Sequence, residues 1–528
     1  MISKFFKTVA ENNFICLPFC FAAGIIGSLP FFFEGAFVLT FLSDFLLFSA
    51  LLQRLNAKRR LFLPCLVFFM GYYIPVYSFL SELYPFERFG FSKGEAVTVL
   101  IAACFFIPLY HSALRSLVLL LLKTAPKNPA LRSLAFASVW AVSEWILSVG
   151  TLAFPWGTTA VALSGFTPFI QNASLFGQYF ISGITALICC LFAISVTTGN
   201  APAKPFFAAL SLFFVFTGVG TGLLISGSGE TSNTFKAALL QGNIDSNDKW
   251  VDGNQQTIFN IYYDLAESAA KEGAEVIILP ETAIPLNFSE NGTLHSRFAK
   301  IATNYKTTVI MGVNIREGNV YYNSVIGILP DGTLTNRYDK RHLVPFGEFI
   351  PYLDLITEIA PFMEEFNEGM GVTVAGRDPA VLSTAQGDLG ALVCFDSIFP
   401  ALASDSVNNG AEAICIVTND SWFEDSIGVT THLRHAKLRA VESRKYVLRA
   451  ANTGISAFID PKGRIIGATE ALTEDVIFAD ISTNSIKTLY STVGDVILYV
   501  FMLIILFNFS VKTINYVRRR KNGKNPTS

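Results

Sequence analysis

Long apolar stretches dominate the first 226 residues of the chain, and one more follows near the C-terminus. A helix needs about 20 mostly apolar residues to cross the hydrocarbon of a bilayer. Stretches close to that length lie at 12–30, 35–52, 61–80, 96–122, 132–149, 178–197, 205–226 and 495–512. The pattern therefore predicts a polytopic α-helical membrane bundle of about eight spans, with seven before a long polar block and one after it.

The composition also indicates lipid surroundings for much of the chain. Of the 528 residues, 52% are hydrophobic and only 15% are charged, whereas charged residues make up about a quarter of a typical soluble domain. The formal net charge is −2, so no global positive field favours nucleic-acid binding. The eight Cys residues show neither a metal-ligand spacing nor a disulfide framework. We expect an integral membrane protein with no metal and no other cofactor.

The Lys and Arg residues of the short loops predict the orientation of the bundle. If eight spans alternate from a cytoplasmic N-terminus, three basic clusters fall on the cytoplasmic side. These clusters are 58–60, the loop residues Lys123, Lys127 and Arg132, and the tail at 518–524. The opposite loop at 150–177 contains no Lys or Arg. Both termini are therefore expected inside, and the polar block 227–487 outside.

That polar block alternates short β runs with helical stretches. Strand patterns lie at 234–243, 275–280, 308–313, 389–394, 413–418 and 455–459, with a hairpin-like run at 320–329 and helical stretches at 255–272 and 430–448. Such alternation is typical of one α/β domain with layered sheets. The predicted organisation is a helical bundle at 1–226, this domain at 227–487, and a last helix with a basic tail at 488–528.

Three reactive side chains stand where predicted strands end, a common place for catalytic groups in α/β folds. They are Glu281, Lys340 and Cys394. Acyl transfer through a thioester needs a base for the thiol and hydrogen-bond donors for the oxyanion. Glu281 is the candidate base, and Lys340 with the backbone N–H of Phe395 are the candidate donors. Glu348 is expected to orient Lys340 or to help move protons.

Taken singly, these residues have ordinary explanations. A Cys at a strand end is more often buried packing than a nucleophile, by roughly four to one. Considered alone, Glu281 and Lys340 are each consistent with an ordinary charged residue on the protein surface. Their order along the chain and the motifs around them favour the catalytic interpretation.

The order of Glu281, Lys340 and Cys394, each in its own strand-end motif, resembles the carbon–nitrogen hydrolase (nitrilase) superfamily. With seven spans before the domain and one after it, the whole chain resembles the bacterial apolipoprotein N-acyltransferases. Matching stretches are Gln241-Gly242-Asn243 with Trp250, Pro280-Glu281-Thr282, the run from Tyr338 to Pro351, Thr418 to Phe423, and His432 to Arg439. Phe395-Asp396 departs from the usual Tyr-Glu and changes the surroundings of the nucleophile.

This resemblance implies a two-step exchange. Cys394, deprotonated by Glu281, would take an acyl chain from a membrane phospholipid, typically phosphatidylethanolamine. The α-amino group of the diacylglyceryl-cysteine that begins an apolipoprotein would then attack the thioester. The resemblance also implies the bacterial inner membrane and supporting roles for Phe395 and Asp396. Trp250, Trp422 and Asn419 are candidates for substrate contact, although core packing explains the two tryptophans equally well.

Other residues leave two interpretations open. Glu144, costly inside a span, either pairs with Arg132 or lines a polar pocket. His432 and His435 have i, i+3 spacing, but no carboxylate or Cys stands at ligand spacing, which argues against a metal. Cys415 is expected to be buried, and both it and Cys394 to stay reduced.

The segment 353–366 interleaves apolar and acidic residues around Pro361. It predicts either a mobile arm at the membrane interface, hinged at Gly369 and Gly371, or a packed surface helix.

Two other functions remain open. A membrane-anchored nitrilase-type amidase or hydrolase would use the same three residues with water as the acceptor. A non-catalytic scaffold or transporter would not need Cys394. The near-absence of paired charges in the predicted spans argues against a transporter.

Overall fold

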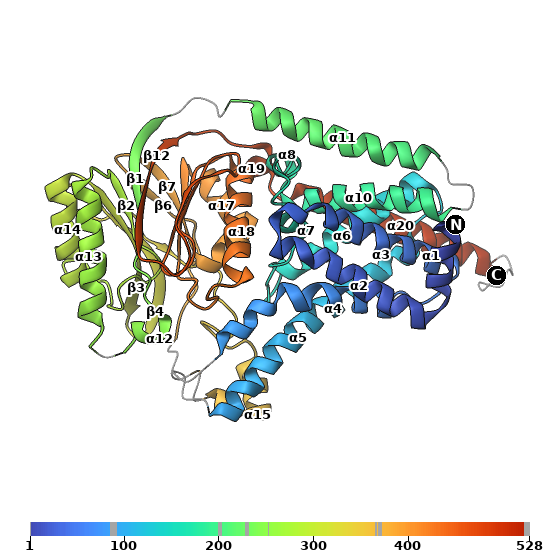
Figure 1. Ribbon diagram of the computed structural model, residues 1–528, viewed down its shortest axis with the longest axis horizontal. Coiled ribbons are helices and arrows are strands. Elements are labelled where there is room, and N and C mark those ends of the chain that lie inside the picture. The colour runs from blue at the N-terminus through green and yellow to red at the C-terminus, as the bar shows by residue number, and fades with distance from the viewer. Residues whose placement is uncertain are drawn as a thin grey trace. The chain divides into compact units, whose positions relative to one another are not determined.

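The computed structural model describes residues 2–84, 92–198, 203–227, 232–251, 253–364, 367 and 372–521. The chain divides into two compact units. One unit combines Met1–Ser78, Ala102–Ile225 and Asp495–Ser528, and the other combines Phe79–Ile101 and Ser226–Gly494. Over the described residues the first unit is helical, and the second contains all the strands (Figure 1).

The helical unit contains segments suited to a bilayer. In the described chain, seven helices are long and apolar enough to cross a membrane. They are Asn13–Phe32, Glu34–Asn56, Lys93–Thr124, Pro129–Ser148, Gln178–Thr197, Ala203–Ile225 and Val496–Arg518. An eighth apolar helix, Phe62–Val76 (α4), has 15 residues and is about 22 Å long, shorter than the ~30 Å hydrocarbon layer. Each predicted stretch is therefore helical, while the number of true spans stays a prediction.

One helix is central to this unit, and others present apolar surface. Helix α10 (Gln178–Thr197) packs against α3 (Val38–Asn56), α6 (Pro129–Trp145) and α11 (Ala203–Ile225). By contrast, α11 and α20 (Val496–Lys521) expose large side chains such as Phe214 and Phe507. Exposed apolar surface of this extent marks an interaction face, and on helices of this length lipid is the natural partner.

A buried ion pair lies inside the helical unit. Arg115 of α5 (Lys93–Leu119) and Glu144 of α6 are each 1% exposed, with 3.5 Å between Arg115 Nη2 and Glu144 Oε1. Glu144 also accepts hydrogen bonds from the hydroxyls of Thr159 and Ser182, both at 2.6 Å. The charge within the span is thus paired, as a low dielectric requires.

The structure corrects the predicted partner of Glu144. Arg132 instead donates to the carbonyl of Pro126 and to Asn56 Oδ1, so the predicted pair with Glu144 is wrong. Glu144 lines, with Asp44 and Arg115, a cavity of about 10 Å³. Arg115–Glu144 is one such pair within the described helices, which agrees with the expected near-absence of paired charges in the spans.

The second unit is built on two six-stranded sheets over the described residues. The first has the order β12-β1-β2-β3-β4-β5, and the second has the order β11-β10-β9-β8-β7-β6. The strands of the first sheet are β1 (Asn233–Gln241), β2 (Val276–Ile278), β3 (Thr308–Glu317), β4 (Val320–Ile328), β5 (Tyr338–Asp339) and β12 (Asp475–Thr483). Those of the second are β6 (Val381–Thr384), β7 (Gly387–Val393), β8 (Ala413–Thr418), β9 (Val447–Ala451), β10 (Ala457–Ile459) and β11 (Ile465–Ala468).

The two sheets pack face to face, and helices cover their outer faces. Side chains alternate along a strand, so Leu239 of β1 joins the core between the sheets with Cys415 of β8. Its neighbour Leu240 faces the other way, toward α13 (Gln255–Lys271) and α14 (Thr293–Tyr305). Helices α17 (Pro400–Asn408) and α18 (Ile427–Ser443) pack on the second sheet (Figure 1). These four layers confirm the predicted α/β domain with layered sheets.

The predicted C-terminal end of one helix is wrong. The helix predicted at 430–448 ends at Ser443 as α18, because Arg444 adopts a left-handed conformation with φ 55°. The chain then turns into β9, which is fully buried between β8 and β10. The apolar residues of 447–451 therefore belong to a central strand and not to the helix.

Candidate active site

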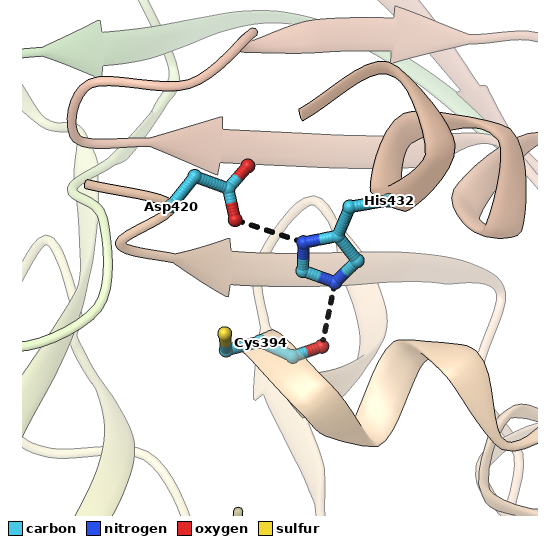
Figure 2. Close-up of side chains that lie close together, drawn as sticks. All are labelled: Cys394, Asp420 and His432. Atoms are coloured by element: carbon cyan, nitrogen blue, oxygen red, sulfur yellow. Dashed lines mark hydrogen bonds and ion pairs between the residues drawn. The ribbon is translucent and has the colours of Figure 1, made fainter. Parts of the chain in front are cut away.

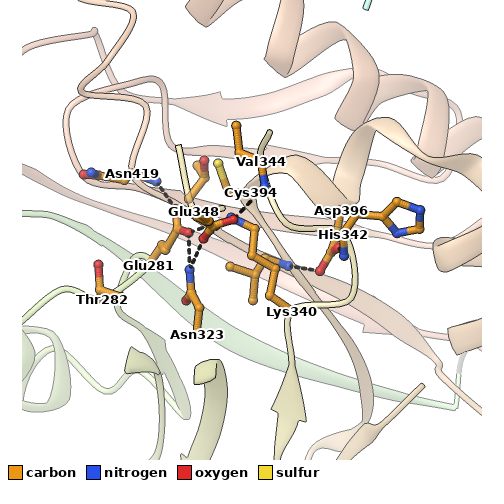
Figure 3. Close-up of polar contacts among 12 residues, drawn as sticks. Glu281, Thr282, Asn323, Lys340, His342, Val344, Glu348, Cys394, Asp396 and Asn419 are labelled. Atoms are coloured by element: carbon orange, nitrogen blue, oxygen red, sulfur yellow. Dashed lines mark hydrogen bonds and ion pairs between the residues drawn. The ribbon is translucent and has the colours of Figure 1, made fainter. Parts of the chain in front are cut away.

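The ends of four strands bring the candidate residues to one place. Glu281 follows β2, Lys340 follows β5, Cys394 follows β7 and Asn419 follows β8. Parallel strands end at the same edge of their sheet, and the face-to-face packing of the two sheets joins these edges. Figure 3 shows Glu281, Lys340 and Cys394 gathered there, with Glu348 beside them.

Lys340 lies between two carboxylates. Its Nζ is 3.2 Å from Glu281 Oε1 and 2.9 Å from Glu348 Oε1. The side chain is 2% exposed, and burial alone would lower the pKa of Lys340. The negative charges of Glu281 and Glu348 outweigh burial and raise this pKa well above its ordinary value. Lys340 is therefore a fixed cation, suited to stabilising negative charge and unsuited to act as a base.

Glu281 is held from several sides. Its Oε2 accepts the backbone N–H of Asn419 at 3.0 Å, and its Oε1 accepts Asn323 Nδ2 at 2.7 Å. The backbone is fixed too, because a Cβ at Gly312 would lie 2.6 Å from the Cα of Glu281. Only glycine allows this close approach. The carboxylate is positioned before any substrate arrives.

Asn323 is a site residue that sequence reasoning missed. Its Nδ2 also donates to Glu348 Oε1 at 3.2 Å, so one amide bridges both carboxylates. Asn323 lies on β4 and is buried. The available signal was an amide in the middle of a strand, where asparagine is disfavoured.

The Cys394 backbone has an unusual conformation. Its φ is 48°, in the left-handed region, and the residue begins the short 3-10 turn Cys394–Ile398 (η6). Burial raises the pKa of the Cys394 thiol, the charge of Glu281 raises it further, and Lys340 partly offsets them. The resting thiol is thus protonated, so nucleophilic attack requires transfer of its proton to a base.

Asp396 connects the Cys394 turn to the Lys340 segment. Its carboxylate accepts Tyr338 OH at 2.8 Å and the backbone N–H of His342 at 2.8 Å. Burial raises the pKa of Asp396 to about 6, although Lys340 and these donors act in the opposite direction. Phe395 is buried and its ring packs on Phe399, with 5.2 Å between centroids.

A second polar group lies on the other side of Cys394. Cys394, Asp420 and His432 each place one potential ligand atom within 4.8 Å of the others (Figure 2). However, the Asp420 carboxylate already accepts Thr418 Oγ1 and pairs with Arg449. Both ring nitrogens of His432 also have partners. The group is thus a hydrogen-bond network.

Comparison with known proteins follows the same division of the chain. The Carbon-nitrogen hydrolase family model matches residues 236–490, and the Apolipoprotein N-acyltransferase N-terminal domain model matches residues 23–191. Apolipoprotein N-acyltransferase of Geobacter metallireducens is 33% identical over 372 residues, which cover 69% of this chain and 71% of the relative. The chain belongs to the apolipoprotein N-acyltransferase family.

A further relative extends this match. Apolipoprotein N-acyltransferase 2 of Treponema denticola is 28% identical over 523 residues, covering 93% of this chain and 94% of that one. Among solved structures, Saccharomyces cerevisiae Nit3, of the nitrilase superfamily, matches at 23% identity with a TM-score of 0.38, covering 49% of this chain and 92% of that one. The predicted resemblance to the apolipoprotein N-acyltransferases is confirmed by the curated relatives and the family models.

The remaining candidates of this apolipoprotein N-acyltransferase family member have different surroundings. Trp250 is 54% exposed, so core packing does not explain it, while Trp422 is partly buried. The side chain of Asn419 bonds to Ser246 Oγ and to Asn452. Asn419 therefore supports Glu281 through its backbone N–H and is itself anchored by its side chain.

The interleaved apolar and acidic segment forms a short surface helix. Helix α15 (Leu353–Ile359) has no buried residue, and its apolar side chains Leu355 and Ile359 are exposed. Residues 365, 366 and 368–371, which include the predicted hinge glycines, lie outside the described residues. The exposed apolar side chains agree with an interfacial segment more than with a packed surface helix.

Proposed function

We propose that this protein transfers a fatty acyl chain from a membrane phospholipid, through a thioester on Cys394, to the α-amino group of the diacylglyceryl-cysteine that begins an apolipoprotein. The observation that carries the proposal is the placement of Cys394 beside the Glu281–Lys340 pair (Figure 3). Family membership supports acyl transfer, and the apolar helices support substrates that reside in lipid.

The first half-reaction loads the enzyme. Glu281 takes the proton of the Cys394 thiol, and Sγ attacks the ester carbonyl carbon of the phospholipid. The oxyanion is held by Lys340 and by the backbone N–H of Phe395. Collapse breaks the ester C–O bond, and Glu281 returns the proton to the departing alkoxide. The products are an acyl-Cys394 thioester and a lysophospholipid.

In the second half-reaction the acyl chain leaves Cys394 for the acceptor. The free α-amino group of the apolipoprotein attacks the thioester carbonyl, and the same two donors hold the second oxyanion. A C–N bond forms and the C–S bond breaks, while Glu281 receives the amine proton and passes it to the leaving sulfur. The free thiol is restored and the lipoprotein has gained an amide-linked acyl chain.

Glu348 has an orienting role in this scheme. Its Oε1 contacts Lys340 Nζ, and its Oε2 accepts the backbone N–H of Val344 at 2.8 Å. A carboxylate fixed to the backbone in this way keeps the Lys340 ammonium in one place. An oxyanion donor that needs no reorganisation during the reaction stabilises the transition state more.

The proposal extends to the donor and to the membrane. Phosphatidylethanolamine is the proposed donor, and the bacterial inner membrane the proposed location. Basic residues cluster in the loops assigned to the inside, so both termini are assigned to the cytoplasm and the domain at 227–487 to the periplasm. In that arrangement the catalytic domain faces the leaflet where exported lipoproteins reside.

Intact-mass analysis of the Cys394 peptide after incubation with phosphatidylethanolamine tests the proposal. We expect an added acyl mass on Cys394, which moves to a diacylglyceryl-cysteine peptide when that acceptor is added. Cys394→Ser and Cys394→Ala should show neither adduct nor product. Release of free fatty acid in place of an acylated peptide would favour a hydrolase, and N-acylation by Cys394→Ala would exclude the thioester.

A further inference from the structure

A small polar cavity lies inside the helical unit, and three ionisable side chains line it. Its volume is about 10 Å³. Asp44 and Thr40 line it from α3, Arg115 from α5 and Glu144 from α6. A buried space of roughly 10–15 Å³ holds one water molecule, provided that it is polar and offers two to four hydrogen-bonding partners. The cavity meets the size condition, so its polar atoms decide whether it binds water.

The Glu144 carboxylate is satisfied by protein groups. Its Oε1 accepts the backbone N–H of Thr159 at 3.0 Å and the hydroxyl of the same residue at 2.6 Å. Its Oε2 accepts Ser182 Oγ at 2.6 Å. Glu144 therefore needs no further hydrogen-bond donor, although it lines the cavity.

One nitrogen of Arg115 lacks such a partner. Nε donates to Ser143 Oγ and Nη1 to Tyr73 OH, each at 3.1 Å. Nη2 lies 3.5 Å from Glu144 Oε1, but it has no hydrogen-bond partner among the described residues. Burial of an N–H donor without a hydrogen bond is unfavourable, and more so when the group is charged. Nη2 therefore requires an acceptor that the described protein groups do not supply.

Two atoms of α3 are in the same situation. Asp44 is 3% exposed and Thr40 is 4% exposed. In the described part of the chain, neither Asp44 Oδ2 nor Thr40 Oγ1 has a hydrogen-bond partner. By contrast, the neighbouring Ser43, which also lines the cavity, donates its hydroxyl to the carbonyl of Ala23 at 2.7 Å. The two unpartnered atoms of α3 and Arg115 Nη2 thus belong to residues that line one cavity.

These three atoms match the hydrogen bonds of one water molecule. A water accepts from Arg115 Nη2, donates to Asp44 Oδ2 and bonds to the Thr40 hydroxyl, and buried waters typically make about three such bonds. It serves Asp44 in either protonation state, because it donates to a carboxylate and accepts from a carboxyl group. A metal cation fits less well, because the guanidinium of Arg115 cannot ligate it and repels it.

We propose that this cavity is a binding site for one water molecule, which joins Asp44 and Thr40 of α3 to Arg115 of α5. The water stabilises the helical unit by giving each of the three buried atoms a partner. It also links α3 to the ion pair between Arg115 and Glu144 of α6. The site is independent of the proposed acyl transfer, because all of its residues belong to the helical unit.

Radiolytic labelling detects such a water directly. The full-length protein in detergent is mixed with H₂¹⁸O and exposed to a short X-ray pulse. Hydroxyl radicals from bulk water label exposed side chains, whereas radicals formed from a bound water label the side chains beside it. The probes are Phe69 and Trp140, which line the cavity and are 0% and 3% exposed. We expect ¹⁸O on both and none on Phe169, which is 0% exposed and outside the cavity lining.

Three substitutions on α3 separate the site from general packing. Asp44→Leu removes the carboxyl group that holds the water, so the ¹⁸O on Phe69 and Trp140 should fall to the level of Phe169. Asp44→Asn keeps an oxygen that accepts a hydrogen bond, so the label should remain. Ser49→Ala is the matched control, because the Ser49 hydroxyl is also buried and unpartnered among the described residues but does not line the cavity. Thermal unfolding identifies the variants that fold.

Absence of ¹⁸O from Phe69 and Trp140 in the wild type overturns the site, and this measurement needs no variant. Undiminished label in a folded Asp44→Leu overturns it as well. A bound cation is tested by thermal unfolding in NaCl and in choline chloride at equal ionic strength, where we expect equal melting temperatures. A higher melting temperature in NaCl that is lost in Asp44→Asn would assign the cavity to Na⁺ and exclude water as its ligand.

Discussion

Asp396 accepts the backbone N–H of His342 at 2.8 Å, and this bond joins the two segments that carry Cys394 and Lys340. The same carboxylate accepts the hydroxyl of Tyr338 on the other side of Lys340. Cys394 and Lys340, the proposed nucleophile and oxyanion donor, are therefore positioned by one buried side chain. Each of its two oxygens accepts one of these hydrogen bonds.

Replacing Asp396 should misplace both groups at once. In Asp396→Asn, the amide nitrogen would face groups that donate hydrogen bonds, so at least one contact is lost. We expect thioester formation to slow by ~100-fold, as displacements of about 1 Å do. Asp405→Asn is the control, because Asp405 pairs with Arg341 on a half-exposed surface and such pairs contribute little. Equal single-turnover rates in the two variants would contradict this role.

Asp396 and His342 should also give opposite pH dependences of stability. Burial raises the pKa of Asp396 to about 6, so the folded state binds this proton more tightly and the stability it contributes is lost as pH rises from about 4 to 6. Burial, aided by Arg341, lowers the pKa of His342 to about 4. The contribution of this buried neutral imidazole to the free energy of unfolding is lost as pH falls from about 6.5 to 4.

In the wild type these two dependences oppose one another between about pH 4 and 6. Asp396→Asn leaves only the His342 contribution, so its melting temperature should fall more steeply on acidification from pH 6 to 4. His342→Gln leaves only the Asp396 contribution and should fall less steeply than the wild type. Melting temperatures of the detergent-purified protein at half-unit steps of pH check both. Parallel curves for all three proteins would show that neither group titrates in this window.

The sequence predicts the features that depend on local pattern. Apolar length identified the helices, and the placement of Glu281, Lys340 and Cys394 after strand-like runs indicated one site. The sequence did not predict the role of Asn323. This role depends on the pairing of β4 with β5 and on the hydrogen bond from Asn323 to Glu281. Strand β12 was missed as well, since it is defined by antiparallel pairing with β1 from the opposite end of the domain.

The same distinction explains the error at Glu144. Arg132 was the nearby basic residue in sequence, on the same predicted span. The true partner, Arg115, lies in an apolar stretch, and only the tertiary fold of the helical unit brings the two side chains together. An arginine in such a stretch predicts a partner, but the sequence alone does not indicate which carboxylate that is.

Removing one member of the Arg115–Glu144 pair should destabilise the helical unit strongly. Each single change, Arg115→Met or Glu144→Gln, leaves a buried charge unpaired, which costs about 3–5 kcal/mol. The double variant should recover part of that loss. Glu11→Gln is the control, because its pair with Lys7 is exposed at 3.9 Å and should matter little. Additive losses in melting temperature across the double-mutant cycle would argue against a coupled pair.

Asn323 offers the sharpest test of how the two carboxylates are organised. Its Nδ2 donates to both Glu281 and Glu348, so Asn323→Ala removes a charge-assisted bond from each. Such a bond contributes roughly 1.5–3 kcal/mol, and we expect acylation of Cys394 to slow about 10- to 100-fold. Asn323→Asp should be slower still, because a third carboxylate would repel the other two and compete for Lys340.

The matched control is Asn336→Ala, an exposed asparagine whose side chain donates to the carbonyl of Val381 at 3.4 Å. Single-turnover acylation is the measurement, since later steps would hide a change in the first. The order wild type, Asn323→Ala, Asn323→Asp should appear in the rates at neutral pH. If Asn323→Asp acylates as fast as the wild type, the amide is only packing, and the positioning of Glu281 must come from Lys340 and the Asn419 backbone alone.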